Sequence, residues 1–400
     1  VRCFPLVTRT PLGSTTIVND REPTSYGQER LWIPKDSLRA LISVLHSDGY
    51  TVMGPTVDQE SAAIVYRVIE TADELPKGWR DAQSAGSYRL QESKTDAYFE
   101  FNVGAHSWKQ FLFPPRVTVS KATRRSEGWE FHLPDETTPK LAFLGVRACE
   151  LAAIAVQDRV FLEGPYVDGD YQRRRQSTLI VAVNCTVAAE TCFCTSMDTG
   201  PGCSAGFDLA LTETDDGFEL EVGSERGTRI VERLHHEPAS ESQQRRAAIA
   251  RQRAIDQINK RMDTTDLREL LIQNLDHPHW DDVADRCLSC TNCTMVCPTC
   301  FCFTVEDVTD LKGLETERVR SWDSCFTTEF TMTSGSAHRA TPVSRYRQWM
   351  THKLATWYDQ FDESGCVGCG RCVTWCPVGI DITEEAAAIR ADDRSQDGPG

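Results

Sequence analysis

The sequence has no long hydrophobic run. Its longest apolar stretches, such as Leu179–Val183, have the length of a strand. None approaches the roughly 18 residues of a membrane-spanning helix. The opening residues, VRCFPLVTRT, also lack the charged and apolar segments of a secretory signal peptide. We therefore expect a cytoplasmic protein that neither crosses nor binds a membrane.

The common nucleotide-binding and hydrolytic motifs are missing as well. There is neither a Walker loop nor a GxGxxG loop, so we expect no nucleotide bound in either familiar way. No histidine stands at the spacing of a metal-ligand pair, and no nucleophile is accompanied by a recognisable base. These absences predict a non-catalytic subunit rather than a self-sufficient enzyme.

Basic residues are too few to balance the acidic ones. Lys and Arg number 43 against 59 Asp and Glu, which gives a net charge of −16. A negative surface is repelled by phosphate backbones and anionic lipid headgroups, so nucleic acid is not an expected partner. The charge suits a plain acidic surface, or one that docks a basic patch of another protein.

Cysteine, by contrast, is abundant, with 17 in 400 residues. Eight of them form two runs of identical spacing, C-x2-C-x2-C-x3-C-P. The runs are Cys287, Cys290, Cys293 and Cys297 before Pro298, and Cys366, Cys369, Cys372 and Cys376 before Pro377. This spacing holds [4Fe–4S] clusters in bacterial-type ferredoxins. Two such runs predict two [4Fe–4S] clusters, and hence a protein that passes electrons.

The fourth cysteine of each run is expected to bind the cluster of the other run, as it does in two-cluster ferredoxins. The first three cysteines lie on one tight turn, whereas the fourth lies a turn away beside proline. The predicted iron ligands of cluster 1 are Cys287, Cys290, Cys293 and Cys376. Those of cluster 2 are Cys366, Cys369, Cys372 and Cys297.

Two other uses of these cysteines, in disulfides or in zinc sites, agree less well with the sequence. A disulfide framework belongs to small secreted domains, and an odd number of cysteines cannot pair completely. Zinc ribbons pair two C-x2-C knuckles rather than repeat a run of four cysteines.

The chain divides into parts of different pattern. We expect a mixed α/β domain over 1–240, a helical connector over 241–280, a helical, ferredoxin-like dicluster domain over 281–390 and a disordered tail over 391–400. Between the two runs lie 68 residues, far more than in a compact ferredoxin, and this segment, 298–365, is expected to be a long helical insert.

The first part of the chain has the pattern of a crossover unit. Apolar runs predict buried strands at 141–146 and 179–183, with a helix over 150–161 between them. A helix over 35–46 and a hairpin across 207–222 are also expected.

The nine remaining cysteines include a further candidate group. Cys149 and Cys185 each follow one of the two buried strands, and Cys192 and Cys194 lie in the loop after Cys185. Because α/β folds place their sites at strand ends and the loops that follow, these four are predicted to bind a third [4Fe–4S] cluster, with Cys203 in reserve. Buried inert thiols, a zinc site or a redox disulfide are the alternatives.

The other cysteines carry weaker predictions. Cys300 and Cys302 extend the first run to CPTCFC and are expected to pack around it. Cys3 and Cys325 have no predicted role.

Five segments resemble one family. They are Arg345–Glu385, the run CLSCTNCTMVCPTCFC, the loop NCTVAAETCFCTSM, the stretch RACELAAIAVQDRVF and QFLFPPR at Gln110–Arg116. They resemble the β subunit of cytoplasmic group 3 [NiFe] hydrogenases, the NAD(P)-linked sulfhydrogenase type. The resemblance spans about 107–390. It is shared more weakly with the A subunit of anaerobic sulfite reductase.

This resemblance implies a four-part complex. A flavin subunit exchanges hydride with NAD(P), the β subunit relays single electrons, and a small subunit carries them to the [NiFe] large subunit. The implied partners of this chain are therefore the flavin/NAD(P)-binding subunit, the hydrogenase small subunit and the [NiFe] large subunit. The cysteine spacing by itself predicts only the relay.

Three other functions remain open. A relay subunit of anaerobic sulfite reductase would have a sirohaem subunit as its partner. A heterodisulfide-reductase-like chain would need a CCG-type repeat, and no Cys-Cys pair occurs in the sequence. A redox sensor would need an effector module such as a helix-turn-helix, against which the acidic charge argues.

Overall fold

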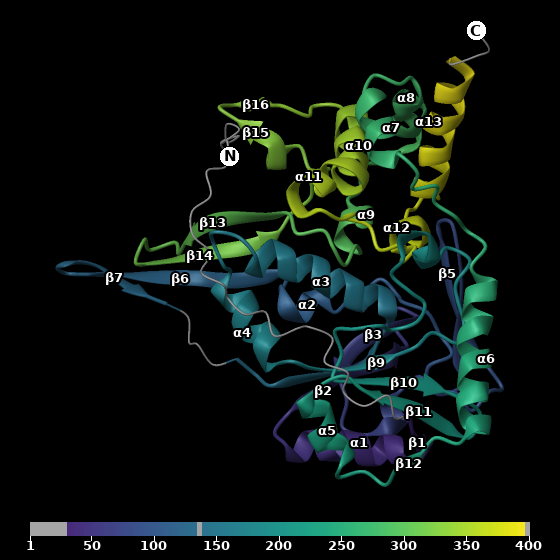
Figure 1. Ribbon diagram of the computed structural model, residues 1–400. Helices are drawn as coiled ribbons and strands as arrows, with labels where there is room; N and C mark the ends of the chain where they lie inside the picture. Colours follow the sequence, from purple (N-terminus) through teal and green to yellow (C-terminus); the bar gives the residue numbers. More distant parts are fainter. Residues whose placement is uncertain (1–29, 134–137, 397–400) are drawn as a thin grey trace, which may run out of the picture.

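The computed structural model describes residues 30–133 and 138–396. Cys3 and the last four residues of the expected tail lie outside this part. Within it, no helix combines the length and the apolar character needed to cross a membrane. An α/β unit lies below a helical unit, and a β-sheet arm extends sideways from the level at which they meet (Figure 1).

An eight-stranded sheet forms the centre of the α/β unit. Its strands, in spatial order, are β12 (Glu237–Pro238), β1 (Leu31–Pro34), β11 (Gly217–Val222), β10 (Leu209–Glu213), β9 (Leu179–Val183), β8 (Leu141–Val146), β2 (Thr51–Asp58) and β3 (Ala63–Val68). The four strands from β10 to β2 are mutually parallel, and the outer pairs are antiparallel. The two predicted buried strands are confirmed as β8 and β9, and they are parallel neighbours.

Helices cover both faces of this sheet (Figure 1). Helices α1 (Ser37–Ser47) and α5 (Glu225–Val231) lie on the face away from the helical unit. Helices α2 (Lys109–Leu112), α3 (Ala148–Leu162) and α4 (Gly169–Ser177) lie on the opposite face. The helices predicted over 35–46 and 150–161 are therefore confirmed, each shifted by one or two residues at its ends.

Helix α3 is buried on two sides, and this determines where the cysteines meet. Leu151 and Ile154 pack into the core on the sheet. Cys149 and Val156 belong instead to a second group of buried side chains, which includes Val367 from the second cysteine run. The helix thus lies between the sheet and the dicluster region.

The arm is a four-stranded antiparallel sheet. Its strands, in order, are β13 (Phe303–Thr309), β14 (Glu315–Trp322), β6 (Arg116–Arg125) and β7 (Gly128–His132). The expectation of a helical insert is therefore wrong for the first half of 298–365. Residues 303–309 are rich in β-branched side chains, which favour strands. Their hairpin is completed by β6 of the α/β unit, a partner that no local pattern reveals.

The second half of that segment is helical and forms the helical unit with its neighbours. Its helices are α7 (Leu267–Gln273), α8 (His279–Arg286), α10 (Pro342–Thr351), a π-helical turn (His352–Thr356), α11 (Trp357–Phe361) and α13 (Ile382–Gln396). Helix α6 (Glu241–Gln257) connects the two units and runs along the sheet (Figure 1). Aromatic side chains of α8 and α10, Trp280, Tyr346 and Trp349, are buried in the core of the helical unit.

Helix α13 continues through Gln396, so the expectation of disorder from residue 391 is wrong as far as that residue. Ile389 is fully buried against the helical core. Arg390 donates hydrogen bonds to the carbonyl oxygens of Asp263 (3.1 Å) and Thr265 (2.6 Å). These contacts hold the middle of the helix against the segment that precedes α7.

Small elements complete the described chain. They are the hairpins β4 (Trp79–Ser84)–β5 (Ser87–Glu92) and β15 (Met332–Thr333)–β16 (Ser336–Ala337), the short helices α9 (Asn292–Met295) and α12 (Arg371–Thr374), and 3-10 turns at Ala72–Glu74, Cys194–Met197 and Glu329–Thr331.

Candidate iron–sulfur centres

The two cysteine runs adopt the same local backbone. In each run the residues before and after the second cysteine are left-handed. Their φ angles are +50° at Ser289 and +70° at Thr291, against +62° at Gly368 and +76° at Gly370. A short helix, α9 or α12, begins directly after this turn. Ser and Thr adopt this conformation at a cost of about 1 kcal/mol each, so the first run is held in its turn by surrounding contacts.

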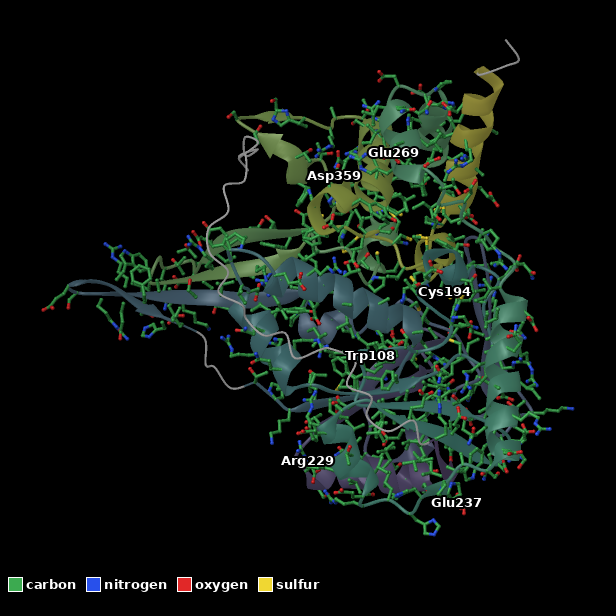
Figure 2. All side chains as sticks on the ribbon, in the orientation of Figure 1. Trp108, Cys194, Arg229, Glu237, Glu269 and Asp359 are labelled. Atoms are coloured by element: carbon green, nitrogen blue, oxygen red, sulfur yellow. The ribbon has the colours of Figure 1, made fainter. Side chains whose placement is uncertain are left out.

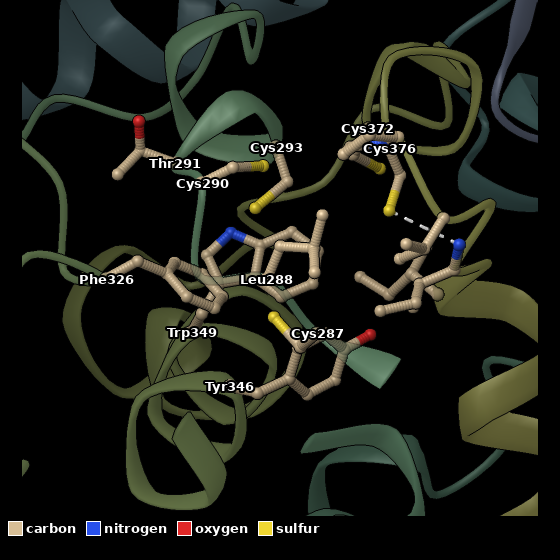
Figure 3. A pocket seen from close by; sticks show the side chains of 14 residues that line it. Cys287, Leu288, Cys290, Thr291, Cys293, Phe326, Tyr346, Trp349, Cys372 and Cys376 are labelled. Carbon is tan, nitrogen blue, oxygen red and sulfur yellow. Dashed lines mark hydrogen bonds between the residues drawn. The ribbon is translucent and has the colours of Figure 1, made fainter. Parts of the chain in front are cut away.

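A cavity, here called cavity 1, is lined by Cys287, Cys290, Cys293 and Cys376 (Figure 3). The first three belong to the first run and the fourth belongs to the second. These are the four predicted ligands of cluster 1. Cys372 also reaches the wall of this cavity.

A second cavity, here called cavity 2, is lined by Cys297, Cys366, Cys369 and Cys372. Three come from the second run and Cys297 comes from the first. The structure therefore brings together both predicted crossed sets of thiols.

Some residues that line the cavities carry buried hydrogen-bond donors without an acceptor. In the described part of the chain, Tyr346 Oη, Trp349 Nε1 and Arg371 Nη1 are buried without a hydrogen-bond partner. The first two residues line cavity 1, and Arg371 lines cavity 2. A buried unsatisfied donor costs about 1–3 kcal/mol. Sulfide and thiolate sulfurs of a cluster accept such hydrogen bonds, so the residues present fit a [4Fe–4S] group in each cavity.

Burial keeps most of these thiols protonated in the absence of iron. It raises the pKa of Cys293 and Cys372 well above the ordinary value, and that of Cys366 to about 12. Because iron binds the thiolate, cluster insertion must release these protons. Cys297 differs: a hydrogen bond from Cys300, and then the charge of Lys353, hold its pKa well below the ordinary value.

Two buried lysines surround Cys297. Lys353 Nζ lies 3.3 Å from Cys297 Sγ. Lys109 Nζ donates to the carbonyl oxygens of Cys297 (2.9 Å) and Cys300 (3.1 Å). Sequence reasoning did not identify either lysine as part of a site. A signal was available for Lys353, because it stands on the apolar face of a helix beside Leu354.

The cysteines of the predicted third group also gather. Cys149 lies in the first turn of α3, Cys185 follows β9, and the loop after it carries Cys192 and Cys194. Burial first, and then the charges of Cys194 and Cys185, raise the pKa of Cys192, so these thiols lie within electrostatic range of one another. Cys194 lies where the α/β unit meets the helical unit (Figure 2). The reserve ligand, Cys203, is also within electrostatic range of Cys185, because burial first, and then the charge of Cys185, raise the pKa of Cys203.

This group is packed directly against the second cysteine run. The N–H of Phe193 donates to the carbonyl oxygen of Gly368 at 2.9 Å. A side chain on Gly368 would come within 2.7 Å of the Cys194 backbone, and one on Gly370 within 2.4 Å of the Thr191 carbonyl oxygen. Both glycines therefore permit the close approach of two loops, and the N–H of Gly368 also donates to the sulfur of Cys366.

The remaining described cysteines contact one another or a predicted ligand. Cys300 donates to Cys297. Cys302 and Cys325 are hydrogen-bonded to each other, which gives Cys325 a neighbour that the sequence did not suggest. Among the residues described, no three side chains are placed to hold a single metal ion.

Comparison with known proteins agrees with this geometry. Residues 286–380 match the family described as a 4Fe-4S dicluster domain. The chain is 33% identical over 285 residues to the sulfhydrogenase 2 subunit beta of Pyrococcus furiosus, covering 70% of this chain and 82% of that protein. The dicluster domain and this similarity identify an iron–sulfur electron-transfer subunit, and the chain belongs to the sulfhydrogenase β-subunit family.

Proposed function

We propose that the chain is the electron-relay subunit of a [NiFe] hydrogenase complex. In this role it passes single electrons between an NAD(P)-linked flavin subunit and the hydrogenase small and large subunits. The observation that carries the proposal is the pair of cavities, each lined by its four predicted ligand thiols, which come from both cysteine runs. A [4Fe–4S] cluster in each would supply one-electron chemistry, with Cys287, Cys290, Cys293 and Cys376 holding cluster 1 and Cys366, Cys369, Cys372 and Cys297 holding cluster 2.

The protein side chains isolate the two centres and join them. Phe326, Tyr346 and Trp349 cover cavity 1 with buried aromatic rings, which exclude water. Cys372 lines both cavities, so the two centres are immediate neighbours.

One edge of cavity 1 reaches the surface, where Leu288 is 64% exposed and Cys290 is exposed. An exposed apolar side chain beside a ligand is a suitable contact for a partner subunit. We propose this edge as one terminus of the relay.

The proposed third [4Fe–4S] cluster, bound by Cys149, Cys185, Cys192 and Cys194, would form the other terminus. Its support is the burial of Cys149 and Cys194 and the packing of the Cys194 backbone against Gly368 of the second run. This order places cluster 2 between cluster 1 and the third group.

The identity of the partners is tested by purifying the native chain from its source under mild conditions. Mass spectrometry of the co-purifying proteins should find a flavin/NAD(P)-binding subunit together with a [NiFe] large subunit and its small subunit. Recovery of a sirohaem subunit in their place would contradict the hydrogenase assignment and indicate a sulfite reductase relay.

The third cluster is tested by iron quantification on the fully loaded chain. We expect about 12 iron atoms per chain, four for each of three cubes, and about 8 in a Cys194→Ser variant. Cys325→Ser is the matched control and should retain about 12, because Cys325 lies outside all three proposed ligand sets. About 8 iron atoms in the unmodified chain would reject the third cluster and leave the two-cluster relay intact.

A further inference from the structure

The two cavities differ in the charge of the side chains around them. The side chains that line cavity 1, all in the described part of the chain, are neutral. Burial raises the pKa of Tyr346 well above its ordinary value, so its hydroxyl is a neutral donor. Cavity 2 is lined by two cationic side chains, Lys353 and Arg371, and by no carboxylate among the described residues. A cluster in cavity 2 would therefore experience a more positive potential.

Of these two cations, Lys353 has the stronger effect on the sulfurs of cavity 2. It is 3% exposed, and its Nζ lies 3.3 Å from Cys297 Sγ. Its other hydrogen bonds go to the hydroxyl of Thr299 (2.9 Å) and the carbonyl of Gly365 (2.8 Å), both uncharged. Within 30–133 and 138–396, no carboxylate lies within ion-pair distance of this ammonium. Its charge is therefore left to act on the sulfurs of cavity 2.

Arg371 also hydrogen-bonds a ligand sulfur, that of Cys369, but it contributes less because its charge is already matched. Its guanidinium is fully buried and lies 2.6 Å from the carboxylate of Glu150. Lys109 lies one layer further out: it binds the carbonyl of Cys297 rather than its sulfur, and it lies 3.9 Å from the centre of the Trp322 ring. Lys353 is thus the one cation of the three that both contacts a ligand sulfur and has no described counter-charge.

We infer that Lys353 is a positioning residue that stabilises the reduced state of cluster 2, so that cluster 2 has a higher reduction potential than cluster 1. The inference rests on the proposed function. Reduction adds one electron, and hence one negative charge, to a group that is already an anion with its four thiolates. A hydrogen bond and a nearby positive charge at a ligand sulfur stabilise that added charge. The electron that reduces cluster 2 is the one that the relay carries, and no bond is made or broken in this step.

For the relay, this difference in potential means that the electron is retained on cluster 2. Cys372 lines both cavities, and the third cysteine group packs against the second run from the other side. An electron that arrives through cluster 1 would therefore come to rest on cluster 2 before it continues.

The test is a redox titration of the full chain with its clusters bound, followed by electron paramagnetic resonance. The cluster 2 signal is assigned as the one lost in a Cys297→Ser variant, and in the unmodified chain it should appear at the higher potential. Lys353→Met should shift the ratio of reduced to oxidised cluster 2 at least tenfold toward the oxidised form, which is 59 mV for a one-electron couple. Lys353→Arg keeps the positive charge, so the potential of cluster 2 should stay close to that of the unmodified chain.

Two controls make the result specific. Lys312→Met removes an exposed lysine in the turn between β13 and β14 and should leave both potentials unchanged. The cluster 1 potential should move far less than that of cluster 2 in Lys353→Met, because the side chains around cavity 1 do not include Lys353.

The inference would be overturned if Lys353→Met left cluster 2 unchanged, if both clusters shifted equally, or if Lys353→Arg behaved as Lys353→Met does. These results would leave the relay itself standing. A chain that binds no clusters would overturn the proposed function, and the inference with it.

Discussion

Replacement of Cys297 by Ser is expected to abolish cluster 2 and to leave cluster 1 in place, although Cys297 belongs to the run that supplies most of cluster 1. The physical reason is the position of its sulfur. Cys297 lines cavity 2 with Cys366, Cys369 and Cys372, whereas cavity 1 receives its fourth thiol from the other run. Serine has nearly the same size but lacks the thiolate that iron prefers, so the change removes a ligand without opening a large void.

The matched variant is Cys376→Ser, which should give the mirror result. Cys376 belongs to the second run but lines cavity 1, so its loss should remove the cluster 1 signal. Each variant should lose about four iron atoms per chain relative to the unmodified protein. Electron paramagnetic resonance of the reduced proteins distinguishes the two signals. If Cys297→Ser lost the same signal as Cys287→Ser, each run would hold its own cluster and the crossed arrangement would be wrong.

The crossed sets could be predicted from the sequence because each run is a local pattern. Three cysteines at every third position determine a turn, and proline after the fourth cysteine marks where the chain leaves it. The strands β8 and β9 were equally accessible, since each is a short, uniformly apolar run that is buried on both faces. Their parallel pairing then brought Cys149 and Cys185 to the same end of the sheet.

Features that depend on distant partners could not be predicted in this way. The hairpin β13–β14 is completed by β6, which precedes it by almost 200 residues. The strand propensity of 303–309 alone did not outweigh the helical pattern in the rest of the segment 298–365. Lys353 belongs to a helical stripe of buried side chains, and its role depends on a sulfur that another segment supplies. The proximity of Cys302 and Cys325 likewise depends on the register between β13 and the residues after β14.

Replacement of Glu150 by Gln is expected to lower the free energy of unfolding by about 3–5 kcal/mol, because it leaves the buried positive charge of Arg371 without its counter-charge. The Glu150 carboxylate accepts hydrogen bonds from Arg371 Nη2 (2.6 Å) and the hydroxyl of Tyr66 (3.0 Å). Glu150 and Arg371 are 1% and 0% exposed, so no water can replace the lost partner. The pair also joins α3 of the α/β unit to α12 of the second cysteine run.

Chemical denaturation of the full chain measures this effect, and Glu317→Gln is the matched control. Glu317 forms an ion pair with Lys121 on the surface of the arm, where solvent screens both charges, so its loss should cost far less stability than the loss of Glu150. A double variant, Glu150→Met with Arg371→Met, removes both charges and should recover much of the stability that Glu150→Gln loses. Equal effects of Glu150→Gln and Glu317→Gln would contradict this account. If the double variant were as unstable as the sum of its single changes, the cost would lie in packing at the junction rather than in the stranded guanidinium.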